Sequence, residues 1–208
     1  MQHDFILLDR TGSMAGQWAE AIASVNLYVK KLVEEKVDTG VTLAVFDGNA
    51  GRLDFRVIRD RIIPSTWHEV STTEVEPRGN TPLNDAIGEI VTLAKKGAPN
   101  GTQYDKLALV VMTDGEENAS KEHTFESASK LLDDCRAKGW QVLFLGANFD
   151  NKRQSQHYGV AAAQSVHTSS ANLSGMTRAV AEKRAWYGTG AVADMAFSDD
   201  EKDKLAKE

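Results

Sequence analysis

The sequence is poor in the features that would assign it to several large classes of protein. It has one cysteine, Cys135, so an internal disulfide framework is excluded and a reducing compartment is favoured. No apolar run approaches the ~20 residues that a membrane-spanning helix needs. The first residues, Met1-Gln-His-Asp, lack the basic start of a signal peptide. We therefore expect a cytoplasmic protein.

Positive charge is also scarce. The chain of 208 residues has 24 Lys and Arg against 30 Asp and Glu, a formal net charge of -6, and its basic residues form no cluster. This balance makes nucleic acid a poor candidate partner. Hydrophobic residues make up 41% of the chain and charged residues 26%, which is ordinary for a globular protein with a substantial core.

The motifs of common enzyme classes are missing as well. The sequence has neither a Gly-x-x-x-x-Gly-Lys phosphate loop nor a Gly-x-Gly-x-x-Gly fingerprint. A metal-dependent phosphatase of the haloacid dehalogenase type is the less favoured alternative. Asp9 stands where its nucleophile would stand, but Thr11 replaces the acid expected two residues later. We expect no catalytic residue.

What the sequence does contain is a regular alternation of apolar strands and amphipathic helices. Residues 5–8, 41–46, 107–112 and 141–145 read as buried strands, and helices are expected over about 16–36, 82–96 and 125–138. Residues 52–57 alternate polar and apolar after a Gly/Asn turn, which predicts an antiparallel edge strand. We therefore predict an α/β fold: a doubly wound, mostly parallel sheet with one antiparallel edge strand and helices on both faces.

The chain is predicted to form one domain over residues 1–190. Its core spans residues 4–150, and a last strand and helix are expected within residues 160–188. Residues 191–208 form a C-terminal tail, either disordered or a short helix.

Hard oxygen donors follow two of the predicted strands. Asp9 ends the first strand, Gly12 allows a sharp turn after it, and Thr11 and Ser13 point back towards the carboxylate. Asp114 ends another strand, and ligands gather at the carboxyl ends of such strands. Carboxylates and hydroxyls suit Mg²⁺, Ca²⁺ or Mn²⁺ rather than zinc.

Together with Thr81, which is predicted to N-cap a helix that starts at Pro82, these residues resemble the metal-ion-dependent adhesion site (MIDAS) of von Willebrand factor A (vWA) domains. The family motifs are Asp-x-Ser-x-Ser, a Thr in a Gly-x-Thr-Pro-Leu context, and Thr-Asp-Gly after an apolar strand. Here they read Asp9-Arg-Thr11-Gly12-Ser13-Met14, Gly79-Asn-Thr81-Pro82-Leu83 and Thr113-Asp114-Gly115. Thr11 replaces the first Ser but keeps its hydroxyl.

The resemblance implies a role for each residue. Thr11 and Ser13 would bind the metal directly, Thr81 directly or through water, and Asp9 and Asp114 mainly through water. The cofactor would be a divalent cation, Mg²⁺ first, with Ca²⁺ or Mn²⁺ as alternatives. Its open position would take an Asp or Glu of a partner protein. The expected function is thus a non-enzymatic, metal-dependent protein-protein interaction.

Polar residues beside the three motifs are candidate partner contacts, because binding residues often lie on loops around a rigid sheet. They are Arg10, Arg78, Asn80, Glu116, Glu117 and Asn118. A second reading stays open, in which the same site joins copies of this chain into a homo-oligomer.

Overall fold

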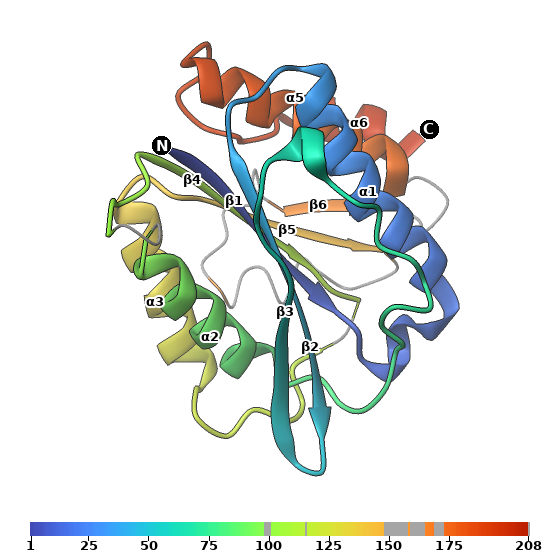
Figure 1. Ribbon diagram of the computed structural model, residues 1–208. Helices are drawn as coiled ribbons and strands as arrows, with labels where there is room; N and C mark the ends of the chain where they lie inside the picture. The colour runs from blue at the N-terminus through green and yellow to red at the C-terminus, as the bar shows by residue number, and fades with distance from the viewer. Residues whose placement is uncertain (98–100, 115, 148–157, 159–164, 169–172, 208) are drawn as a thin grey trace.

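A computed structural model shows a central sheet with helices on both of its faces (Figure 1). It describes residues 1–97, 101–114, 116–147, 158, 165–168 and 173–207. The strands are β1 Gln2–Asp9, β2 Gly40–Asn49, β3 Arg52–Ile62, β4 Lys106–Met112, β5 Gln141–Ala147 and β6 Ser165–Thr168.

The six strands lie in the order β3-β2-β1-β4-β5-β6. Every neighbouring pair is parallel except β2 and β3, which are antiparallel. This confirms the predicted α/β fold with one antiparallel edge strand.

The α-helices are α1 Trp18–Glu34, α2 Leu83–Lys95, α3 Phe125–Ala137, α5 Leu173–Thr189 and α6 Asp199–Lys207, and two short 3₁₀ helices are η1 Gly12–Gln17 and η2 Pro64–Thr66. In Figure 1, α1, α5 and α6 lie on one face of the sheet, and α2 and α3 on the other. Within the described part of the chain, none of these helices has the length and apolar character needed to cross a bilayer.

The central strand β1 explains why the core has two layers. Successive side chains of a strand point to opposite faces. Ile6 and Leu8 pack into the apolar cluster beneath α1 and α5, whereas Phe5 and Leu7 pack into the cluster beneath α2 and α3. All four are at most 1% exposed. A strand covered on both faces reads as a continuous apolar run, as the sequence indicated. Cys135 is buried in the second cluster, where burial raises the pKa of its thiol.

The edge strand β3 is longer than expected. Polar and apolar residues alternate only over 52–57, but the strand continues to Ile62. Its pairing with β2 shifts register between Val41 and Leu43 and again between Leu43 and Ala44. Such irregularities break the two-residue period, so the alternation disappears from the sequence although the pairing continues.

The start of α2 also differs from the prediction. Thr81 is not its N-cap: Pro82 occupies that position and makes no side-chain cap. The first free N–H groups of the helix are instead satisfied by a distant loop. The backbone N–H of Asn84 donates to Glu117 Oε2 at 2.8 Å, and the backbone N–H of Asp85 donates to Ser120 Oγ at 3.1 Å. Because this loop caps the helix, the Thr81 side chain is not needed there.

The C-terminal part of the chain packs onto the same sheet. Strand β6 pairs with β5 and lies within residues 160–188, where the last strand was expected; residues 159–164 lie outside the described residues. Met176 and Val180 of α5 are fully buried, as the predicted helix requires. Beyond residue 190, Met195 and Phe197 join the apolar cluster beneath α1.

A buried ion pair fastens α5 to β1. Arg184 donates from Nε to Asp4 Oδ1 at 2.5 Å, and both side chains are 0% exposed. Arg184 Nη1 also donates to Gln2 Oε1 at 2.9 Å, and Tyr28 of α1 donates its hydroxyl to Asp4 at 3.3 Å. The guanidinium of this late helix is therefore held by groups from the first part of the chain.

This arrangement predicts the effect of breaking the pair. Arg184→Met should reduce the free energy of unfolding by about 3–5 kcal/mol, because it leaves the Asp4 carboxylate buried without a counter-charge. The double variant Asp4→Leu/Arg184→Met removes both charges and should recover most of that loss. Urea unfolding followed by circular dichroism measures both effects. A loss below ~1 kcal/mol in the single variant would show that the pair does not hold α5.

Candidate metal centre

The sheet topology brings two of the predicted ligands together. Strands β1 and β4 are parallel neighbours, and Leu8 pairs with Met112. The residues that follow them, Asp9 and the Thr113-Asp114 pair, therefore leave the sheet at the same carboxyl edge. Asp9 is 0% exposed, whereas Asp114 is partly exposed.

A chain of hydrogen bonds links four of the five candidate ligands. Asp9 Oδ1 accepts the backbone N–H of Thr11 at 2.7 Å. The hydroxyls of Thr11 and Ser13 are 3.1 Å apart, and Ser13 Oγ donates to Asp114 Oδ1 at 2.8 Å. Two carboxylates and two hydroxyls from distant parts of the sequence thus surround one point of the sheet edge.

Thr81, the fifth candidate, is held beside this group by its backbone. Its N–H donates to Asn118 Oδ1 at 2.9 Å, and its carbonyl accepts the N–H of Asn118 at 3.1 Å. The side chain is buried, at 3% exposed. Among the described contacts, its hydroxyl is not hydrogen-bonded to the other four candidates.

The turn at Gly12 is built differently from the expectation. Gly12 does not have a positive φ; it begins the 3₁₀ helix η1, in which Met14 N–H donates to the Thr11 carbonyl at 3.1 Å. The glycine that the site requires is Gly79, whose φ is +69° and whose added Cβ would lie 2.0 Å from the Gly48 carbonyl oxygen. This close approach seats the Thr81 loop against β2.

The electrostatics of Asp9 favour a cation. Burial raises the pKa of its carboxyl group to about 6, with a smaller contribution from the negative charge of Asp114, while hydrogen bonds from Thr113 and Thr11 oppose the shift. Within the described part of the chain, no Lys or Arg forms an ion pair with Asp9 or Asp114. All five candidate donors are hard oxygen atoms, so the residues fit a divalent cation such as Mg²⁺.

The candidate ligands do not form a metal site of the type made from His, Cys and several carboxylates. Among the described residues, no group of three or more His, Cys, Asp or Glu side chains converges in a metal-holding arrangement. The cluster contains only two carboxylates, and hydroxyls supply the rest of its donors.

Two of the predicted partner contacts are engaged inside the protein. Arg10 is only 2% exposed, and its Nη2 donates to Asp47 Oδ1 at 2.9 Å. Arg10 is therefore an internal residue that stabilises its loop. The prediction that it contacts a partner is wrong. Glu117 is also engaged: its Oε1 accepts the backbone N–H groups of Ala119 and Ser120 at 2.9 and 2.7 Å.

The other four predicted contacts lie at the surface around the cluster. Asn80 and Glu116 are exposed, and Asn118 is exposed although its Oδ1 is bonded to Thr81. The side chain of Arg78 is 45% exposed and reaches Asp47 and Asp54.

Two side chains next to the carboxylates were not among the predicted site residues. Gln17 donates from Nε2 to Asp114 Oδ2 at 2.7 Å, and Thr113 donates its hydroxyl to Asp9 Oδ2 at 2.6 Å. Thr113 belongs to the third motif, so its position was available from the sequence. Gln17 follows Ser13 by four residues, but a glutamine near a helix start is too common to indicate a role.

Solved structures with a similar fold include a pilus adhesin, a manganese-loaded protein and a byssus matrix protein. The pilus adhesin SpaC of Lactobacillus rhamnosus GG matches with a TM-score of 0.63 and 12% identity, over 89% of this chain and 30% of that one. Manganese-loaded TRAP of Plasmodium vivax matches with a TM-score of 0.60 and 14% identity, over 84% and 70%. Proximal thread matrix protein 1 of the mussel byssus matches with a TM-score of 0.65 and 15% identity, over 88% and 46%.

This chain therefore spans less than half the length of the adhesin and of the byssus protein. At these identities the likeness concerns the fold alone. A search among curated proteins gave no match.

The family model of the von Willebrand factor type A domain matches residues 5–175. That span contains all three motifs, most of β1, the whole of strands β2 to β6 and the hydrogen-bonded cluster at the sheet edge. Domains of this family typically act in adhesion or protein interaction. The chain belongs to the von Willebrand factor type A domain family.

Proposed function

We propose that this chain is a non-enzymatic module that binds an acidic residue of a partner protein in a divalent-metal-dependent way. Asp9, Thr11, Ser13, Thr81 and Asp114 would hold the cation, which would supply a position that attracts a carboxylate. The chain's own part is to hold these oxygen atoms together at a rigid sheet edge and to leave Ser13 exposed to an incoming group.

One observation carries the proposal: Asp9 is a fully buried carboxylate whose hydrogen-bond partners among the described residues are uncharged. Asp47, near the end of the neighbouring strand β2, is equally buried but forms ion pairs with two arginines. Burying a carboxylate without a counter-charge is costly. A cation at the Asp9 cluster would offset that cost, as the arginines do for Asp47.

Relatives give limited but consistent support. Vivax TRAP, whose fold this chain shares, was crystallised loaded with manganese. Two carboxylates leave a divalent cation able to attract one more anionic oxygen. An Asp or Glu of a partner provides such an oxygen, and the exposed Asn80 and Asn118 could donate hydrogen bonds to it.

The proposal predicts that metal stabilises the fold. At 100 times its dissociation constant, Mg²⁺ or Mn²⁺ should add about 2.7 kcal/mol and raise the melting temperature by about 5–10 °C. Asp9→Ala and Ser13→Ala should each lose most of the shift, because each removes a ligand. Differential scanning calorimetry with added metal or with EDTA measures the change.

Substitutions at Thr11 provide the matched control for this measurement. Thr11→Ser keeps the hydroxyl and should keep the shift, whereas Thr11→Val keeps the shape and should lose it. If none of Mg²⁺, Mn²⁺ and Ca²⁺ moves the melting curve of the wild-type protein, the metal site does not exist.

A second prediction concerns pH in the absence of metal. The folded-state pKa of Asp9 is about 6, whereas the ordinary pKa of an aspartate side chain is 3.8. Because the folded state holds the proton more tightly, the stability linked to Asp9 is fully present below pH ~3.8 and is lost as the pH rises through ~6.

Asp9→Asn should therefore become more stable than the wild type as the pH rises, by at most about 3 kcal/mol above pH ~7. Comparing the two proteins in EDTA from pH 4 to pH 8 cancels the contribution of every other titrating group. A stability difference that does not change with pH would contradict the raised pKa of Asp9.

A further inference from the structure

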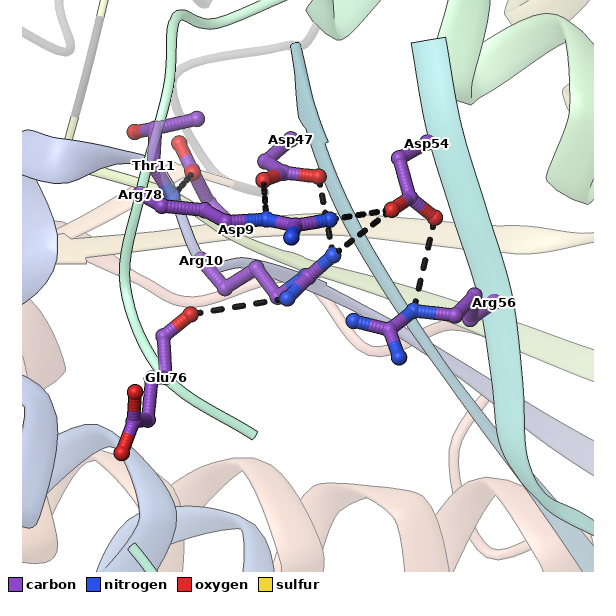
Figure 2. Close-up of polar contacts among 8 residues, drawn as sticks. All are labelled: Asp9, Arg10, Thr11, Asp47, Asp54, Arg56, Glu76 and Arg78. Atoms are coloured by element: carbon purple, nitrogen blue, oxygen red, sulfur yellow. Dashed lines mark hydrogen bonds and ion pairs between the residues drawn. The ribbon is translucent and has the colours of Figure 1, made fainter. Parts of the chain in front are cut away.

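The carboxylate of Asp47 joins two loops that carry candidate metal ligands, although it is not itself a candidate ligand. It follows Phe46, which pairs with Asp9 across β1 and β2, and it is 0% exposed. Its Oδ1 accepts Arg10 Nη2 at 2.9 Å, and its Oδ2 accepts Arg78 Nε at 2.6 Å (Figure 2). One buried side chain thus fixes two arginines.

One arginine lies inside the first motif, and the other directly precedes the second. Arg10 stands between Asp9 and Thr11, and Arg78 directly precedes Gly79 in the loop that leads to Thr81. The backbones of these loops also touch: the N–H of Arg78 donates to the Arg10 carbonyl at 2.8 Å, and Gly12 N–H donates to the Gly79 carbonyl at 3.1 Å. The side-chain bridge and the backbone contacts hold the same two segments.

We infer that Asp47, acting through Arg10 and Arg78, is a positioning residue that sets the first and second metal loops at the spacing the cation needs. The inference rests on the proposed metal site. Thr81 needs such support because, among the described contacts, its hydroxyl makes no hydrogen bond to the other candidate ligands. Its place relative to Thr11 and Ser13 depends on how its loop is held.

The geometry suits arginine rather than lysine. Asp54 Oδ2 accepts from Arg10 Nη2 at 3.1 Å and also from Arg78 Nη2, so each guanidinium joins Asp47 to Asp54 (Figure 2). A planar guanidinium presents several donors in a fixed arrangement, whereas a lysine ammonium is a single point charge. Lys at position 78 would keep the charge but not the double bridge.

Arg56 is a matched control in the same cluster. It contacts Asp54 through Nε at 3.4 Å, and its side chain is 48% exposed against 45% for Arg78. It lies on β3 and has no contact with Asp47 in the described structure. Replacing either arginine by Met removes one positive charge near Asp54, but only the change at position 78 removes the bridge between the metal loops.

In Arg78→Met, the lost positive charge and the lost positioning contact should change the affinity for a cation in opposite directions. Loss of a positive charge near a cation site strengthens cation binding by simple electrostatics. Loss of a positioning contact weakens it. The sign of the change therefore separates the two roles.

The experiment is a titration of full-length protein with Mn²⁺, followed by the electron paramagnetic resonance signal of free Mn²⁺. We expect the dissociation constant to rise at least fivefold in Arg78→Met and to rise in Arg78→Lys. In Arg56→Met it should stay the same or fall. Melting curves in EDTA should show all three variants folded, with no larger loss of melting temperature in Arg78→Lys than in Arg56→Met.

Unchanged or tighter Mn²⁺ binding by both Arg78 variants, with normal binding by the wild type, would overturn the positioning role and leave the proposed function intact. Equal weakening in Arg56→Met would also overturn it, because the effect would then not depend on the bridge. Failure of the wild-type protein to bind Mn²⁺ would overturn the proposed function and this inference together.

Discussion

The structure depends on how charge is buried at the carboxyl edge of its sheet. Asp9 ends β1 and Asp47 lies near the end of the neighbouring strand β2, and both are inaccessible to water, where an uncompensated carboxylate is costly. The two buried carboxylates have different kinds of partner. Arginines from two loops form ion pairs with Asp47, whereas the donors to Asp9 among the described residues are a hydroxyl and a backbone N–H. The arginines neutralise Asp47, and Asp9 is left without a charged partner in the part of the chain that the structure describes.

The strands that carry the site could be predicted from the sequence because they are covered on both faces. Residues 5–8 and 107–112 are apolar throughout, and each ends at a polar residue, so the positions of Asp9 and Asp114 followed directly. The cluster of Asp9, Thr11, Ser13 and Asp114 was found in this way. The length of β3 could not be predicted in this way, because register shifts in its pairing with β2 interrupt the alternation of polar and apolar residues.

Local sequence patterns could not predict which distant residues the buried side chains bind. Arg10 lies on a loop beside the motifs and reads as a surface residue; only its bond to Asp47, 37 positions away, places it inside. The cap of α2 is a similar case, since Glu117 comes from a loop far along the chain. Propensity rules assign a cap to the residue just before the helix, and here tertiary contacts replace it. Arg184 likewise forms an ion pair with a residue near the opposite end of the chain, Asp4.

The edge strand β3 has a consequence for how this protein behaves in crowded solution. A long edge strand offers free backbone N–H and C=O groups to any other strand, and such edges promote polymerisation into extended sheets. Here the edge bears Arg52, Arg56, Arg59 and Arg61, and its pairing partner is irregular at Val41–Ala44. Charged side chains and a distorted register both discourage another strand from adding to an edge. The β2–β3 hairpin has both features, so the strand that ends the sheet is a poor template for further pairing.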